Sequence, residues 1–447
     1  MRRLIRRVID TDALPKALFA LSVSILMFGY GAVADHYRLF PVPMIGEAKA
    51  ALLEWTERPW YLGDSRESQT VHVFAADRMA PGLTLISGMS FDGTTRLRVV
   101  DAQGRTVQSW RLSWSDLWPN PTHVTAEVTP SHPLVHGVLL MPNGDVVLNF
   151  DALGMLRVNE CGKVVWRLPY GTHHSLNLDD QGYIWASGVV WRRERVARFS
   201  NYEPPFSDYT IVQVSPDGRI VNELSVLDLL LQNGLTGLAH MSTIDDRSTV
   251  VSGDTLHLND VEIFPSSLAP GVFQSGDVMI SLRNINTIIV FDPRTRRIKF
   301  MTVGQVLRQH DPDFVDGNTI SVFDDNNLAD WTDGKPDPAG HFSRIVTISA
   351  KDNKIAVLYQ GTKGHPFFTD ILGNHQLLPN GNILITESVP GRVFEVDAGG
   401  RIVWEYFNLV KPGLVGLVPD AVRLAPQFSA SFFSRASAIC SIAPEDE

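Results

Sequence analysis

The stretch LMPNGDVVLNFDALGMLRVNECGKVVWRL, residues 140–168, contains three short runs of alternating apolar residues separated by turns rich in Gly, Asn and Asp. Residues 377–407, LLPNGNILITESVPGRVFEVDAGGRIVWEYF, repeat this pattern nearly position for position. Alternation with a period of two predicts half-buried strands, and short Gly-containing turns predict that successive strands are antiparallel. The repeated unit is therefore a small antiparallel sheet.

Weaker copies of the unit begin at Gly82, Gly182, Gly276 and Gly317, which makes six copies in all. Repeated units of three or four strands are typical of the blades of a β-propeller, whose ring hides the edges of its sheets. We predict an all-β fold, a six-bladed β-propeller over residues 71–412, followed by a tail over 413–447. An open sandwich or two separate β domains fit less well, because the unit recurs to the end of the chain.

Residues 17–34, ALFALSVSILMFGYGAVA, carry no charged side chain and follow five Arg and Lys residues. This length approaches the thickness of a bilayer, and the basic flank predicts a cytoplasmic N-terminus. We expect residues 1–35 to form an inner-membrane anchor with the main domain in the periplasm, joined by a helical linker over 36–70 that includes Lys49–Glu57. A signal peptide cleaved after Ala34 is the alternative.

The 447-residue chain has 39 Lys and Arg, 49 Asp and Glu, and a formal net charge of −10. This balance argues against a nucleic-acid partner, which would need a basic face. Two cysteines, Cys161 and Cys440, are too few for a disulfide framework, although one bridge between them is possible. The oligomeric state is not fixed by these observations.

Four histidines hold nearly the same place in the repeat, six to eight residues before the glycine of the turn. They are His136, His174, His310 and His375, and an insertion separates a fifth, His257, from its glycine. Equivalent positions on the innermost strands of a propeller converge on its axis, so we expect five imidazoles to face one funnel. Turn or core histidines and a metal site are the alternatives. We predict no metal, because no H-E-x-x-H or comparable ligand motif accompanies them.

Arg283 ends the apolar run GDVMISLR, where an unpaired charge is costly unless it meets an anion. Its guanidinium suits a sulfate, phosphate or carboxylate group, since it donates two parallel hydrogen bonds. A surface ion pair is the alternative. Neutral imidazoles beside one arginine predict a site where an oxyanion is bound and its central atom attacked.

Several short motifs in this order resemble the bacterial aryl-sulfate sulfotransferases, which do not use PAPS. The motifs are T-H-H at 172–174, H-L-N at 257–259, S-L-R at 281–283, Q-H-D at 309–311 and N-H-Q-L-L-P-N-G-N at 374–382. The resemblance covers about residues 70–410. It implies a six-bladed propeller, an aryl sulfate donor, a phenolic acceptor and no cofactor.

The resemblance also implies a role for each candidate residue. His310 is the nucleophile that becomes sulfated, His257 the general acid and base, and His174 with Arg283 the group that holds the sulfuryl oxygens. Asn259, His375, His173 and His136 are expected to bind substrate. A neutral imidazole that forms a covalent intermediate predicts ping-pong kinetics.

The chain departs from the family pattern in having only about 35 residues between the apolar segment and the first strands, where some relatives carry a β domain used in dimerisation. Two other functions stay open at this point. One is a non-catalytic propeller that binds a ligand or protein, and the other is a metal-dependent hydrolase of the lactonase type.

Overall fold

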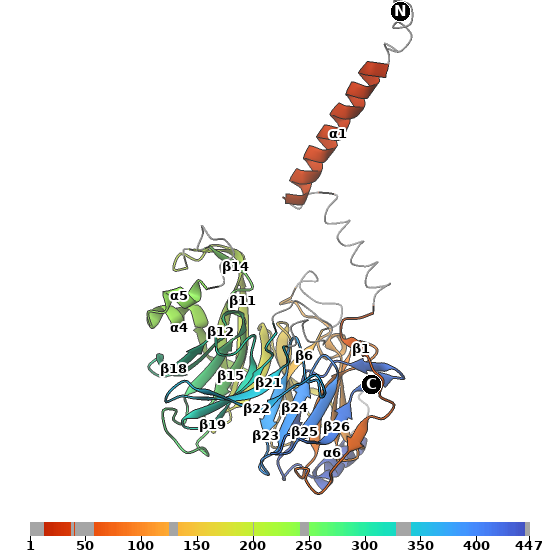
Figure 1. The fold of residues 1–447 in the computed structure, drawn as a ribbon, viewed down its shortest axis with the longest axis vertical. Helices are drawn as coiled ribbons and strands as arrows, with labels where there is room; N and C mark the ends of the chain where they lie inside the picture. Colours follow the sequence, from red (N-terminus) through yellow and green to blue (C-terminus); the bar gives the residue numbers. More distant parts are fainter. Residues whose placement is uncertain are drawn as a thin grey trace, which may run out of the picture. The chain divides into compact units, whose positions relative to one another are not determined.

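The computed structural model describes residues 13–36, 40, 58–124, 133–199, 201–241, 250–327 and 341–442, and the chain divides into two compact units, Met1–Trp60 and Tyr61–Glu447. In the first unit the helix α1, Ala13–His36, is continuous (Figure 1). Its segment Leu14–Ala34 is long and apolar enough to cross a membrane. The linker helix expected over Lys49–Glu57 lies outside the described residues.

The second unit is all-β, as predicted, and its described strands form antiparallel sheets. Three sheets have the orders β29(Asp420–Arg423)-β3(Thr84–Met89)-β4(Thr95–Val100)-β5(Thr106–Leu112), β6(Val135–Leu140)-β7(Val146–Phe150)-β8(Gly154–Val158)-β9(Val164–Leu168) and β10(Thr172–Leu178)-β11(Ile184–Arg192)-β12(Tyr202–Val214)-β13(Ile220–Ser225). Three more have the orders β15(Leu258–Ile263)-β16(Val278–Leu282)-β17(Thr287–Asp292)-β18(Arg297–Val303), β19(His310–Asp316)-β20(Thr319–Asp324)-β21(Arg344–Ser349)-β22(Ile355–Gln360) and β23(Asn374–Leu377)-β24(Ile383–Glu387)-β25(Arg392–Val396)-β26(Ile402–Phe407). Figure 1 shows β23 to β26 in this order.

Shorter elements complete the unit. The strand β2, Val71–Val73, extends the last sheet beside β26, and β14, Val251–Gly253, runs parallel to β12. A small separate sheet has the order β1(Leu62–Asp64)-β28(Leu414–Gly416)-β27(Leu409–Lys411). The described helices of this unit are α3(Trp114–Leu117), α4(Val226–Gln232), α5(Thr236–Ala239), the 3-10 turn η2(Arg283–Ile285) and α6(Ala430–Ile442).

The first strands of the six larger sheets contact one another in a closed order. β6 contacts β10, β10 contacts β15, β15 contacts β19, β19 contacts β23, β23 contacts β29, and β29 returns to β6. Side chains that point from one sheet to the next form the core, for example Leu97 with Phe150 and Phe206 with Phe291. A circular succession of sheets around shared inner strands is typical of β-propellers.

The C-terminal segment is part of this circle, whereas we expected a tail from residue 413. β29 pairs with β3, so that Asp420 lies opposite Ser87 and Arg423 opposite Thr84. The buried Arg423 guanidinium also donates to the Glu395 carboxylate of β25 at 2.9 Å. An inner strand from the end of the chain therefore completes a sheet whose other strands come from its beginning.

The turns of the quoted repeats have the predicted geometry. Gly144 and Gly381 have φ angles of +96° and +85°, which only glycine adopts without strain. Helix α6 is tied to the body by a disulfide between Cys440 and Cys161, which lies in the turn between β8 and β9. The bridge that the sequence left open is therefore present.

Candidate functional site

Two cavities meet at His174. The first, which we call the channel cavity, has a volume of about 260 Å³ and is lined by residues of all six inner strands or their ends. The second, the side cavity, has a volume of about 450 Å³ and lies against residues of β10, β11 and β12 and the start of β15. His136, His174, His310 and His375 line the channel cavity, whereas His257 lines the side cavity. The five imidazoles that we expected around a single funnel are thus divided between two cavities, and His174 lines both.

The inner strands are irregular where the site residues lie. Register shifts interrupt β10 after His173, β15 after Leu258 and β19 after His310. His174 and His257 have φ angles of +56° and +52°, a conformation that is costly for residues other than glycine. Bulges and such backbone angles turn side chains out of the regular alternation, and here they bring imidazoles of neighbouring sheets together.

His174 is the centre of the histidine cluster. The centroid of its ring lies 4.0 Å from that of His136, 5.2 Å from that of His257 and 6.3 Å from that of His310. Its Nδ1 atom lies 2.6 Å from the Nδ1 atom of His173, so one of these rings donates to the other. Burial lowers the pKa of His173 to about 4 and that of His174 well below its usual value. Both rings are therefore neutral at pH 7.

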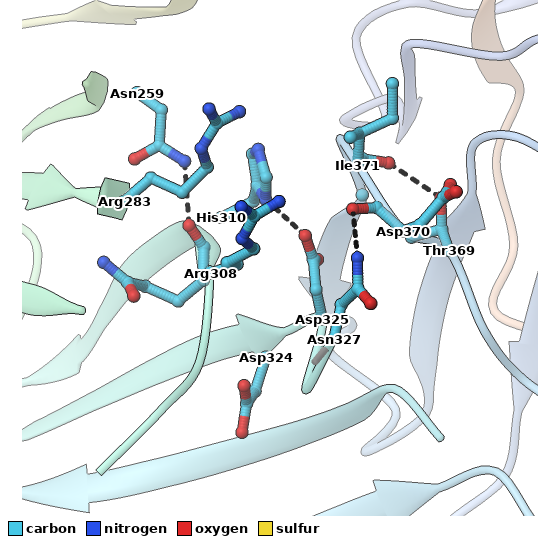
Figure 2. A network of polar contacts seen from close by, with 12 residues as sticks. Asn259, Arg283, Arg308, His310, Asp324, Asp325, Asn327, Thr369, Asp370 and Ile371 are labelled. Atoms are coloured by element: carbon cyan, nitrogen blue, oxygen red, sulfur yellow. Dashed lines mark hydrogen bonds and ion pairs between the residues drawn. The ribbon is translucent and has the colours of Figure 1, made fainter. Parts of the chain in front are cut away.

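His310 is a buried residue whose ring nitrogens have no hydrogen-bond partner among the described residues. The residue is 3% exposed, and its buried Nε2 atom has no hydrogen-bond partner among the described residues. Its Nδ1 atom lies 3.0 Å from Oδ2 of Asp325, although the angle falls short of a hydrogen bond (Figure 2). Burial and the Arg283 charge lower the pKa of His310 well below its usual value. The Nε2 lone pair is therefore free for attack.

Two arginines lie beside this imidazole. Figure 2 shows Arg283, at the end of β16, and Arg308, two residues before β19, close to His310 and Asp325. Burial lowers the pKa of Arg283, while the Asp254 charge opposes the shift. Burial raises the pKa of Asp325, and both arginines oppose that shift. The site therefore concentrates positive charge where an oxyanion would bind.

His257 belongs to a second network. Its Nδ1 atom lies 2.6 Å from Oδ2 of Asp254, and the Tyr209 hydroxyl donates to Oδ1 of the same carboxylate at 2.5 Å. Nη2 of Arg283 lies 3.2 Å from the same His257 nitrogen. Burial alone would raise the pKa of Asp254, but His257, the Tyr209 hydrogen bond and the Arg283 charge together outweigh it and the pKa falls. The Asp254 carboxylate is thus ionised and holds the His257 ring in place, while Nε2 of His257 is buried without a partner among the described residues.

Asn259 and His375 differ in whether their polar atoms are already hydrogen-bonded within the protein. The Asn259 amide donates to the Gln309 carbonyl at 2.8 Å, next to His310, and its buried Oδ1 atom has no partner in the described part of the chain. In His375, by contrast, Nδ1 lies 2.9 Å from Oδ2 of Asp311 and Nε2 lies 2.8 Å from the Ser321 hydroxyl. Both ring nitrogens are engaged, so His375 positions Asp311 and has none left for the substrate role we expected.

The channel cavity is strongly acidic away from the histidines. Asp260, Glu262, Asp313 and Asp420 line it, and burial raises the pKa of each, that of Asp420 to about 7. Burial thus favours the neutral form of these carboxyl groups.

Two groups of side chains have the donor atoms of a metal site. In the set His136, Asp151 and His174, and in the set Asp311, Asp313 and His375, the ligand atoms lie within 4.8 Å of one another. The second set has its imidazole nitrogens committed to Asp311 and Ser321, so the first has the more available donors.

Sequence reasoning found the imidazoles and Arg283 but missed the residues that orient them. Asp254 precedes His257 by three positions and Arg308 precedes His310 by two, so both lay within reach of a local search. Asp325 lies in DGNTISVFDDN, residues 316–326, the stretch after Q-H-D that also belongs to the resemblance, but no role was expected of it. Tyr209 comes from β12, and nothing in its local sequence marks it. The structure brings His136, His173, His174, His257, Asn259, Arg283 and His310 together around the meeting point of the two cavities.

An unpartnered neutral imidazole beside two arginines has the donors and the nucleophile that suit binding an oxyanion and attacking its central atom. Comparison with protein families makes this specific, since residues 137–408 match the model of the Arylsulfotransferase (ASST) family. The chain belongs to this family, and the match includes every site residue named above except His136 and Asp420.

Similar solved structures include a protein of unknown function from Bacteroides caccae, with 11% identity over 76% of this chain and 98% of that chain and a TM-score of 0.46. A streptogramin B lyase has 11% identity, coverage of 76% and 88%, and a TM-score of 0.39. TolB from Acinetobacter baumannii has 10% identity, coverage of 76% and 66%, and a TM-score of 0.42. At these values no function is transferred from them.

Proposed function

We propose that the protein is an aryl-sulfate sulfotransferase that moves a sulfuryl group from a phenolic sulfate ester to a phenol through a sulfated His310. The observation that carries the proposal is the buried, unpartnered Nε2 atom of His310, with Asp325 behind the ring and Arg283 beside it. Membership of the arylsulfotransferase family supports sulfotransfer in general.

In the first half-reaction, Nε2 of His310 attacks the sulfur and the bond from sulfur to the phenolic oxygen breaks. The leaving phenolate takes the Nε2 proton of His257 in its imidazolium form, leaving His257 neutral; burial lowers the pKa of His257, and the ionised Asp254 opposes that shift and favours the protonated ring. A phenol has a pKa of about 10, so its departure at neutral pH needs this proton. The His310 ring becomes positively charged as the nitrogen-sulfur bond forms, and Asp325 stabilises that charge.

In the second half-reaction, a phenol replaces the product and gives its proton to the now neutral His257. Its oxygen attacks the sulfur, the nitrogen-sulfur bond breaks, and His310 returns to its neutral state. Arg283 and Arg308 balance the charge of the sulfuryl oxygens in both steps, and His174 contacts them as a neutral ring, as preorganised groups do in other group transfers. This scheme uses only side chains of the chain itself.

The proposal extends to the fold and the location. The six sheets in circular contact support a six-bladed propeller whose inner strands carry the site. The apolar helix α1, its basic flank and the disulfide between Cys161 and Cys440 support a single-pass inner-membrane protein with its β-domain in the oxidising periplasm.

The test is a mass measurement after a single donor addition. The purified protein is mixed with 4-nitrophenyl sulfate alone, and we expect one equivalent of nitrophenolate and one added sulfuryl group on the peptide that contains His310. Adding phenol then removes the group. The His310→Ala variant should do neither, whereas His72→Ala, which alters a histidine paired with Glu67 on β2, serves as the matched control. Steady turnover by His310→Ala would refute the assignment.

One observation favours a second function, a metal-dependent hydrolase. The donor atoms of His136, Asp151 and His174 are close enough to converge on one ion. The test is hydrolysis of an ester or lactone before and after chelation. Activity that disappears on chelation and returns with Zn²⁺ or Ca²⁺ would favour this function over sulfotransfer, provided that no sulfated histidine forms.

A further inference from the structure

The side cavity is lined by both ionisable and apolar side chains. Asp151, His173 and His257 line it, and Leu153, Val189 and Trp191 contribute apolar surface. A volume of about 450 Å³ holds an aromatic ring with a substituent of a few atoms. The cavity can therefore take a phenol with its hydroxyl at His257 and its ring against the apolar side chains.

Arg193 also lines the side cavity, directly after β11. It belongs to the run WRRERVAR, residues 191–198, which contains four arginines. Three of them are paired: Arg192 with Asp208 at 2.6 Å, Arg195 with Glu203, and Arg198 with Asp228 at 3.0 Å. Among the described residues, Arg193 forms no ion pair or hydrogen bond, and its side chain is exposed.

Arg193, the arginine of this run that lines the cavity, is thus the one without an ion pair among the described residues. A guanidinium at the edge of an apolar cavity recognises a carboxylate through charge-assisted, two-pronged hydrogen bonds. The sulfuryl oxygens are already served by Arg283 and the imidazoles, so Arg193 is available for a second anionic group on the organic part of the substrate.

We infer that the protein prefers phenols that carry a carboxylate on the side opposite the hydroxyl, and that Arg193 is the residue that selects them. This inference rests on the proposed sulfotransfer and names its acceptor class. It makes Arg193 a specificity-determining residue, with no part in the attack on sulfur.

The experiment compares 4-hydroxyphenylacetate with 4-hydroxyphenylacetamide as acceptors, with 4-nitrophenyl sulfate as donor. The two acceptors have the same shape and differ in charge. We expect kcat/KM to be about tenfold higher for the acid, as for one charge-assisted contact near the surface, and added salt to reduce the ratio. In Arg193→Gln the ratio should fall to about one through a loss on the acid alone, because only the charged contact is removed.

Arg195→Gln is the matched control, because it removes a neighbouring arginine that pairs with Glu203. An Arg193→Gln variant that lowers both acceptors equally, or keeps the preference for the acid, would overturn the inference and leave sulfotransfer standing. Absence of turnover with every acceptor would instead count against the proposed function. Calorimetric titration of the acid and the amide into both proteins then decides the role of Arg193, since binding of the acid alone should weaken in Arg193→Gln.

Discussion

Replacing Asp325 by asparagine should slow sulfation of His310 without changing the shape of the site. The carboxylate lies 3.0 Å from the His310 ring nitrogen and is fully buried. When the imidazole becomes cationic, an ionised Asp325 at 3.0 Å contributes at most about 5.5 kcal/mol at an effective dielectric constant of about 20, and because burial raises the pKa of Asp325, ionising its carboxyl takes part of this energy. Since each 1.36 kcal/mol is a factor of ten in rate, the variant should be slower by up to about four orders of magnitude.

The assay is a stopped-flow measurement of nitrophenolate release in a single turnover, which isolates the first half-reaction. Asp324→Asn is the control, because Asp324 is the neighbouring buried carboxylate and pairs with Arg344 at 2.7 Å. Its loss should lower the melting temperature but change the burst rate of the folded protein by less than about tenfold. A burst rate for Asp325→Asn within tenfold of the wild type would refute the charge argument.

Three further predictions concern stability. The buried His173, with a pKa lowered to about 4, is neutral in the folded state but protonated in the unfolded state below pH 6.5, so acidification from pH 7 to 5 should cost about 2 kcal/mol through this residue. His173→Gln should lose correspondingly less in urea titrations at the two pH values, and an equal loss would contradict the assignment. Asp420, with a pKa raised to about 7, has the opposite sign, because the folded state holds the proton. Stability lost between pH 5 and 8 should therefore be smaller in Asp420→Asn than in the wild type by about 2.5 kcal/mol, measured in the same way. The bridge between Cys161 and Cys440 spans a sequence separation of 279 residues, so its replacement by two serines should cost about 5 kcal/mol by loop entropy, and a melting temperature that does not change would show that the reduced chain is equally constrained.

The strand pattern could be predicted because it is local. In residues 140–168 the alternation and the glycine turns determine β7, β8 and β9 whatever lies beside them. The partner of β3 could not be found this way, since β29 is only four residues long and lies more than 300 positions away. Pairing at such a separation depends on ring closure, which no sequence window contains.

The site shows the same division. His174 and His310 were found because they recur in phase with the repeat, and His257 because an insertion accounts for its larger distance from the glycine. The phase did not predict that His375 differs from the others. Its two ring nitrogens are engaged by Asp311 of the neighbouring sheet and by Ser321. Hydrogen bonds between sheets decide which imidazole keeps a free nitrogen, and these depend on packing.

The pairing of β29 with β3 has a consequence for biogenesis. A ribosome or an export channel delivers the chain from its N-terminus, so β3, β4 and β5 emerge long before the strand that completes their sheet. Until β29, Asp420–Arg423, is delivered, the circle of sheets stays open and the positions of the inner strands relative to one another are not fixed. Assembly of the histidine cluster is thereby postponed to the last stage of delivery.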